Sequence, residues 1–238
     1  MSELKPRTLI SVQKHLRDQV ANALRAALIA GDLKPGVIYS APTLAAEYGV
    51  SATPVREAML DLAREGLVEA VRNKGFRVTE LSERDLDEYT EIRSLIEIPT
   101  VGRVTRSASR EELEALRPVA EEIVAAAHAG DLIGYLESDR RFHLGLLGLA
   151  GNSRLVETVA DLRKRSRLYG LTELAEAGAL VASAQEHTAL LDLMLAGDSA
   201  AAEEHMRHHL AHVRTLWAAR NQEKAGERTS SVRKLGTR

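Results

Sequence analysis

A short stretch between Gly66 and Leu81 has the pattern of two strands, whereas the segments on both sides of it have helical periodicity. This change of pattern constrains the fold more than any other feature of the chain. Leu67–Val71 and Phe76–Leu81 are apolar runs that flank Arg72-Asn73-Lys74-Gly75. Asn and Gly supply the positive φ angles that a tight hairpin turn requires. We therefore predict a β-hairpin at this position.

Three helical segments precede the hairpin. Apolar residues recur at three-to-four spacing from about Val12 to Ala30, which indicates an amphipathic helix. A second, short helix fits Pro42–Tyr48, with Ser40 placed to cap it. A third helix begins at Ser51-Ala52-Thr53-Pro54, where a proline is tolerated in the first turn. Helix, helix, turn, helix and hairpin is the order of a winged helix-turn-helix domain, which we predict over residues 8–80.

The remaining chain has helical periodicity to about residue 220. We expect helices over residues 83–107, 110–129, 132–150, 153–170, 173–196 and 199–220. Short connections such as Gly130-Asp131 imply antiparallel neighbours. The predicted class is thus mainly α, with a winged helix-turn-helix followed over residues 82–220 by an antiparallel all-helical bundle of six or seven helices. Residues 221–238 are polar and basic, and we expect them to be disordered.

Composition excludes several classes of protein. The 238 residues include no cysteine, so any metal must be held by histidine and carboxylate groups. No stretch approaches the roughly 18 apolar residues of a membrane span, and the first residues lack the apolar run of a secretory signal. We therefore expect a cytoplasmic protein without a membrane partner.

The net charge of −2 hides a gradient along the chain. Residues 1–80 carry 11 basic and 9 acidic groups, residues 81–220 carry 16 and 23, and residues 221–238 carry 5 and 2. The ends are positive and the middle is negative, which indicates a polyanionic partner for the first part alone.

The first turn of the third helix is the part that would reach base edges, because an α-helix fits the major groove of DNA. Ser51 and Thr53 can donate hydrogen bonds there, and Arg56 can bind a guanine or a phosphate with two bonds. Arg72 and Lys74 at the hairpin tip suit the adjacent backbone or minor groove. Folds of this kind also serve as protein-interaction modules, and the pattern alone leaves that alternative open.

The amino-acid sequence of this segment resembles that of the DNA-binding domain of the GntR family. The resemblance lies in Ala-x2-Leu-x4-Ile-x-Gly-x-Leu-x-Pro-Gly at 21–36, Val-Ser-x-Thr-Pro-Val-Arg-Glu-Ala at 50–58, Glu-Gly-Leu-Val at 65–68 and the wing-like Lys-Gly-Phe-Arg-Val at 74–78. It implies a regulator that binds operator DNA. The residues expected to contact DNA are Ser40, Ser51, Thr53, Pro54, Arg56, Arg72, Lys74 and Gly75. Two recognition helices reading paired half-sites imply a homodimer.

Two positions depart from the family pattern. The family commonly has arginine after the serine of the Val-Ser motif, where this chain has Ala52, and often another arginine where this chain has Pro42. Each missing guanidinium removes contacts worth about 1–3 kcal/mol of discrimination between bases. The operator sequence of relatives therefore does not transfer, and Arg56 and the wing must carry more of the contact.

A group of histidines and one aspartate is the second notable feature. Asp139 and His143 are four residues apart, on one face of a helix. A solvated pair or a helix-stabilising hydrogen bond would have the same spacing. His187 lies beside the apolar Leu190 and Leu191 and is expected to face inward, where a hydrogen-bonded core histidine is the alternative.

The last predicted helix contains His205, His208, His209 and His212. His209 lies at the edge of the apolar face and is the first choice for an inward position, with His205 and His208 as alternates. Three inward imidazoles and one carboxylate on three helices of a bundle form a plausible divalent site. Such donors suit zinc, nickel, cobalt or manganese.

From Ser82 to about Arg220 the chain resembles the FCD ligand-binding domain of FadR-type GntR regulators, in which a helical bundle encloses a metal held by one aspartate and three histidines. Its motifs match Asp-Arg-Arg-Phe-His at 139–143, Glu-His-x2-Leu-Leu at 186–191 and Met-Arg-His-His-Leu at 206–210. The resemblance implies a divalent metal, zinc before the others, and its ligands are Asp139, His143, His187 and His209.

The same resemblance points to two effector-binding residues. Arg93 would bind the carboxylate of an effector, and Asn152 matches the turn after the metal-bearing helix. The alternative for Arg93 is a pair with Glu97 on a helix surface.

Together these features predict a ligand-responsive transcription regulator, not an enzyme, whose operator binding is modulated by a small organic acid bound at a divalent metal. The alternative from another class is a metal-dependent hydrolase that uses the same aspartate and histidines. No His-Glu-x2-His motif supports it. A metal-free helical adaptor is a third alternative.

Overall fold

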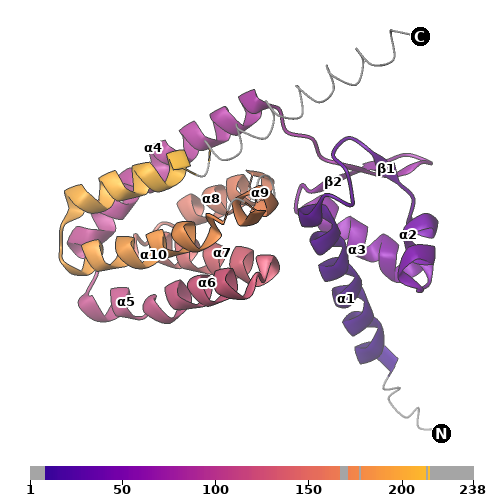
Figure 1. The fold of residues 1–238 in the computed structure, drawn as a ribbon, viewed down its shortest axis with the longest axis horizontal. Helices are drawn as coiled ribbons and strands as arrows, with labels where there is room; N and C mark the ends of the chain where they lie inside the picture. The colour runs from indigo at the N-terminus through magenta and orange to yellow at the C-terminus, as the bar shows by residue number, and fades with distance from the viewer. Residues whose placement is uncertain (1–8, 167–170, 177, 213, 215–238) are drawn as a thin grey trace, which may run out of the picture. The chain divides into compact units, whose positions relative to one another are not determined.

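The chain divides in this computed structural model into two compact units, Met1–Glu80 and Leu81–Arg238, named here the N-terminal and C-terminal units. The structure describes residues 9–166, 171–176, 178–212 and 214 (Figure 1). The predicted basic tail, 221–238, lies outside the described residues, as do 215–220 of the last predicted helix. No helix among the residues described is both long and apolar enough to span a membrane.

The N-terminal unit contains three helices and a small sheet. Its elements are α1 (Leu9–Ala30), β1 (Ile38–Tyr39), α2 (Ala41–Tyr48), α3 (Ala52–Arg64), β2 (Val68–Val71) and β3 (Gly75–Val78). The strands pair antiparallel in the order β1-β3-β2. The predicted hairpin is present as β2 and β3, whereas β1 was not predicted, because two residues are too few to show a strand alternation.

The sequence positions α3 through its apolar stripe and two ion pairs. Val55, Met59 and Leu62 of α3 are fully buried, and α3 packs against α1. Arg17 Nε of α1 donates to Asp61 Oδ2 at 2.6 Å. Arg25 donates to Glu65, the residue that follows α3. The packing fixes the outer face of α3 relative to the rest of the unit.

Gly75 lets β1 approach the hairpin. The turn contains Asn73 at φ 59° and Gly75 at φ 132°. A Cβ at Gly75 would lie 2.3 Å from the carbonyl oxygen of Tyr39 in β1. At this contact it is backbone that would have to move, so the strand pairing depends on glycine here.

Gly75→Ala should therefore lower the free energy of unfolding of the N-terminal unit by about 1–3 kcal/mol, since it adds overlap to backbone strain. Urea unfolding followed by circular dichroism measures this. Gly49→Ala is the matched control, because Gly49 has φ 66° but nothing within 4 Å of a Cβ. An equal effect at both positions would show that strain, and not the contact with Tyr39, is responsible.

The C-terminal unit is helical throughout its described residues (Figure 1). It contains α4 (Glu83–Ser107), α5 (Arg110–Glu114), α6 (Arg117–Ala129), α7 (Leu132–Gly148), α8 (Ser153–Ser166), α9 (Leu171–Glu176) and α10 (Leu180–Leu195). The last helix begins at residue 199 and is described to residue 212. The predicted class, mainly α with a winged helix-turn-helix and a helical bundle, is confirmed.

Two predicted helices are each divided in two. Segment 110–129 is divided into α5 and α6, because the ring of Pro118 would clash with the carbonyl of Glu114, where α5 ends. Segment 173–196 is divided into α9 and α10 at Gly178, whose φ of 69° ends a helix. These divisions add short helices without changing the six expected segments.

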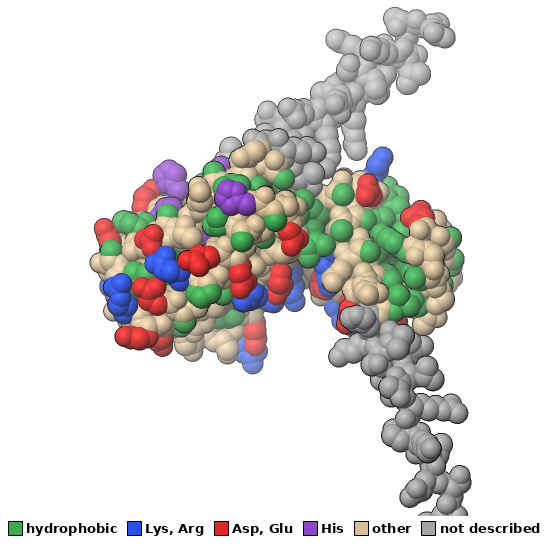
Figure 2. Space-filling model, turned by 60° about the horizontal axis from the view of Figure 1, so that its bottom comes forward, with side chains coloured by type: hydrophobic (Ala, Val, Ile, Leu, Met, Phe, Trp, Pro, Cys, Tyr) green, Lys and Arg blue, Asp and Glu red, His purple; other side chains and the backbone are tan. Residues whose placement is uncertain are grey.

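In the part of the C-terminal unit that the structure describes, the buried side chains of arginine, aspartate and glutamate lie in one cluster. Charged side chains of both signs lie over the face of this unit seen in Figure 2. Four others are buried at 2% exposure or less, namely Arg93, Glu97, Asp139 and Arg163. Charged groups are almost never fully buried unless they are paired, so this cluster marks a candidate site.

Candidate functional site

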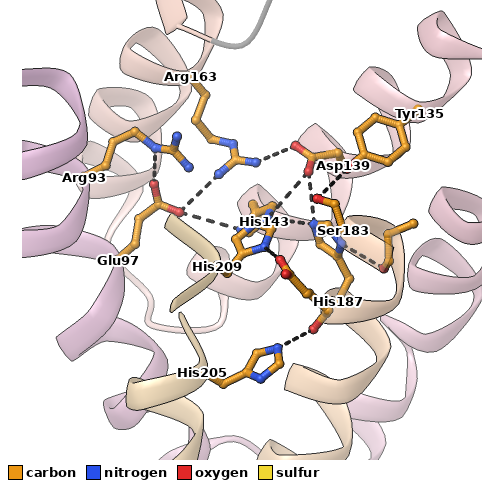
Figure 3. A network of polar contacts seen from close by, with 12 residues as sticks. Arg93, Glu97, Tyr135, Asp139, His143, Arg163, Ser183, His187, His205 and His209 are labelled. Atoms are coloured by element: carbon orange, nitrogen blue, oxygen red, sulfur yellow. Dashed lines mark hydrogen bonds and ion pairs between the residues drawn. The ribbon is translucent and has the colours of Figure 1, made fainter. Parts of the chain in front are cut away.

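The cluster contains the four residues that the sequence nominated as metal ligands. Asp139 and His143 lie one turn apart on α7, His187 lies on α10, and His209 lies on the last helix (Figure 3). All four are buried. Each offers one ligand atom, and these four atoms lie within 4.8 Å of one another. The structure thus brings together residues from three helices.

The imidazole rings and the carboxylate face a common centre. Nε2 of His187 lies 3.1 Å from Nε2 of His143 and 3.0 Å from Oδ1 of Asp139. The ring of His209 stacks on that of His143 at a centroid distance of 5.2 Å and meets that of His187 edge-on at 4.8 Å.

On each histidine the other ring nitrogen faces an oxygen acceptor. Nδ1 of His187 donates to the carbonyl of Ala184 at 3.0 Å, and Nδ1 of His209 donates to Oε2 of Glu186 at 2.6 Å. Nδ1 of His143 lies 3.6 Å from Oε2 of Glu97. The two hydrogen-bonded acceptors favour a proton on Nδ1 of His187 and of His209 and direct the Nε2 lone pairs of these two rings inward.

The donor set fits a divalent cation. Nε2 of His143 and Nε2 of His187 lie 3.1 Å apart, so a cation between them could accept a lone pair from each ring. Three imidazole nitrogens and one carboxylate oxygen suit zinc, nickel, cobalt or manganese. The outer acceptors supply the partners that metal-ligating histidines almost always have.

Alternating charges extend from the carboxylate across the interior. Oδ2 of Asp139 accepts from Nη2 of Arg163 at 2.5 Å, and Nη1 of Arg163 lies 3.3 Å from Oε2 of Glu97. Oε1 of Glu97 accepts from Nε of Arg93 at 2.6 Å. Two guanidinium groups thus balance two carboxylates and join α4, α7 and α8.

Burial and these charges set the protonation of the cluster. Burial, together with the positive charge of Arg163, lowers the pKa of His143 well below its ordinary value. Burial alone would raise the pKa of Glu97, but the guanidinium groups of Arg93 and Arg163 outweigh it and lower that pKa. His143 is therefore neutral and able to bind a metal at neutral pH, and Glu97 is ionised.

The predicted effector residues have different surroundings. Arg93 is buried and pairs with Glu97, so the pair exists but does not lie on a helix surface. Its Nη2 has no hydrogen-bond partner among the described residues. Asn152 is exposed, and its Oδ1 accepts from the backbone N–H of Leu155 at 3.2 Å. Asn152 caps the start of α8, and the structure does not bring it into the cluster.

Among the histidines of the last helix, His209 is the one with a ligand atom in the cluster. His208 has a side chain that is 82% exposed. Nε2 of His205 donates to the main-chain oxygen of Glu186 at 2.8 Å. The helix therefore presents its first-choice ligand, and not the two alternates, to Asp139 and the other histidines.

Sequence reasoning missed three residues of the cluster. Glu97 was considered only as a surface partner of Arg93, and Glu186 only as part of the motif before His187. The sequence did not indicate that Arg163 is buried, because this residue lies in a basic run that resembles a solvated helix end. Spacing to Arg93 and adjacency to His187 were the available clues for the two glutamates.

In the N-terminal unit the predicted DNA-contacting residues divide into two groups. The first group is exposed: Ser51, Thr53 and Arg56 at the start of α3, and Arg72 and Lys74 in the turn between β2 and β3. The second group has structural contacts. Ser40 caps α2 by accepting from the N–H of Thr43, Pro54 is half-buried, and Gly75 lies against Tyr39.

The N-terminal unit has a winged helix-turn-helix with an exposed recognition turn and a basic wing tip. This is the architecture of a DNA-binding transcription regulator. The family model "Bacterial regulatory proteins, gntR family" matches residues 16–78, and the model "FCD domain" matches residues 88–212. The chain belongs to the GntR family of bacterial regulators and carries an FCD domain.

Individual relatives agree with this assignment. The chain is 31% identical to the HTH-type transcriptional regulator YdhC of Bacillus subtilis over 82% of this chain and 87% of YdhC. It is 32% identical to the HTH-type transcriptional regulator McbR of Escherichia coli over 82% of this chain and 87% of McbR. The solved structure of Escherichia coli McbR matches with a TM-score of 0.61 at 30% identity, over 88% of this chain and 98% of that one.

A putative GntR regulator from Rhodococcus has the same fold, with a TM-score of 0.65 at 23% identity over 85% of this chain and 97% of that one. The relatives confirm the predicted family and the prediction that the chain is a regulator and not an enzyme. They give the hydrolase alternative no support.

Proposed function

We propose that this regulator binds operator DNA as a cytoplasmic homodimer and responds to a small carboxylate effector at a divalent metal, zinc before nickel, cobalt or manganese. The metal would be held by Asp139, His143, His187 and His209. The observation that carries this proposal is the convergence of these four buried donors, each histidine with its Nδ1 toward an oxygen acceptor. Such an arrangement is costly unless a cation shares the lone pairs.

The charge of the site favours an anionic effector. Arg93 and Arg163 balance Glu97 and Asp139, so a divalent cation held by the cluster would add uncompensated positive charge to a buried site. A cation held by these four residues would attract the carboxylate oxygens of an effector. Nη2 of Arg93, buried without a hydrogen-bond partner among the described residues, is suited to bind such a carboxylate.

The helix α4 is the element through which the site would act. It is the first helix after the boundary between the units, and its middle carries Arg93 and Glu97. Near its start, Oδ1 of Asp87 accepts a hydrogen bond from Nε of Arg214 at 2.7 Å. An effector that prefers one placement of α4 would change operator affinity through that preference alone.

This function is tested by measuring operator binding of metal-replete and of metal-stripped protein. Each form is measured with a panel of small mono- and dicarboxylates. We expect near-stoichiometric metal in protein purified without chelator, and at least one acid that changes operator affinity only in the metal-replete form. Metal-stripped protein that responds equally to the same acid would contradict the proposed site. Light scattering that shows only monomers, with and without operator, would contradict the dimer.

Arg56→Ala should weaken operator binding by about 1–3 kcal/mol, or roughly five- to 150-fold, because Arg56 is the arginine exposed in the first turns of α3. Fluorescence anisotropy at a fixed salt concentration measures this. Arg64→Ala is the control at the other end of α3, where Arg64 pairs with Asp61. Equal losses for both variants would indicate a general charge effect and not a contact made by the first turns.

A further inference from the structure

Glu186 is the meeting point of three histidines from the last helix. His205, His209 and His212 are spaced by four and three residues, so they lie on one face of that helix. All three contact Glu186 of α10, the residue directly before His187. The two helices are thus joined along a row of hydrogen bonds.

The two carboxylate oxygens of Glu186 have separate partners. Oε2 accepts from Nδ1 of His209 at 2.6 Å, and Oε1 accepts from Nδ1 of His212 at 2.8 Å. The side chain of His209 is 3% exposed, whereas that of His212 is 37% exposed. One oxygen therefore faces a histidine of the buried cluster, and the other faces a histidine at the surface.

We propose that Glu186 is the positioning residue that makes His209 a metal ligand. By accepting from Nδ1, its carboxylate keeps the proton there and turns the unprotonated Nε2 of His209 toward Asp139, His143 and His187. The negative charge also makes that imidazole a stronger donor. This inference rests on the metal site proposed above and identifies which residue outside the ligand set controls it.

His212 separates this role from a merely structural one. If Glu186 only linked α10 to the last helix, this link would depend on both of its carboxylate oxygens. Loss of His212 should then weaken the link between the helices as well. Positioning of His209 depends on Oε2 alone. The two explanations therefore differ in what His212→Ala does to metal binding.

The test uses the full chain with zinc or cobalt, whose affinity is measured by competition with a chelator. Glu186→Ala should lower the affinity about ten- to a hundredfold. Glu186→Gln, which keeps an oxygen acceptor but loses the charge, should recover most of the affinity. His212→Ala should stay within about twofold of the parent. Equal losses for Glu186→Ala and His212→Ala, or no loss for Glu186→Ala, would overturn the proposal.

A second readout does not depend on bound metal. Nitrogen-15 spectra of the histidine rings in metal-stripped full-length protein should show His209 protonated on Nδ1 in the parent and in His212→Ala. Glu186→Ala should shift this proton toward Nε2. If the parent binds no metal, the proposed function fails while the spectra still report on Glu186. If the parent binds metal and the ring proton does not move, the positioning role alone fails.

Discussion

His187→Ala should lower the affinity for divalent metal by roughly a hundred- to a thousandfold. A protein zinc site is worth about 10–16 kcal/mol in total, so one of four ligands accounts for about 3 kcal/mol. Nε2 of His187 also lies close to two of the other donors, at 3.0 Å from Oδ1 of Asp139 and 3.1 Å from Nε2 of His143. Metal analysis after dialysis and chelator competition measure the loss.

His208→Ala is the control for this variant. It also removes an imidazole, but the side chain of His208 is 82% exposed and pairs with Glu204 outside the cluster. We expect it to retain parental metal content. In His187→Ala the response of operator binding to an added carboxylate should disappear together with the metal. Parental metal affinity in His187→Ala would contradict the ligand role of His187, and a parent that binds no metal would favour the metal-free helical adaptor.

The N-terminal unit was predictable because its signals are local. The cap Ser40, the recognition turn at Ser51 and the hairpin turn at Asn73 each act on residues a few positions away. The two-residue strand β1 was missed, since its pairing with β3 depends on a close approach at Gly75 that no local pattern encodes.

The C-terminal site was predictable only in part. The pair Asp139 and His143 follows from helical spacing, but the meeting with His187 and His209 depends on how three helices pack, which periodicity does not determine. Family resemblance supplied that step. Arg163 could not be found this way, because a buried arginine and a solvated one have the same sequence pattern until the helix opposite is known.

Glu97→Ala should lower the free energy of unfolding of the metal-stripped C-terminal unit by about 3–5 kcal/mol, because breaking a buried ion pair leaves its charge uncompensated. Glu97 is fully buried and bridges Arg93 and Arg163. Without it, two guanidinium groups share the interior with one carboxylate of the cluster, Asp139. Urea unfolding followed by circular dichroism, with chelator present, separates this effect from any change in metal binding.

The same helix provides the matched control. Arg84 and Glu88 of α4 are also an arginine and a glutamate four residues apart, with Nε and Oε1 at 2.8 Å, but their side chains are 87% and 54% exposed. Glu88→Ala should leave the unfolding midpoint unchanged, because water compensates an exposed charge. Replacing Arg93 and Glu97 together by methionine should cost less than Glu97→Ala alone, since both members of the pair are removed. Equal midpoints for Glu97→Ala and Glu88→Ala would show that burial does not make the Arg93–Glu97 pair a determinant of stability.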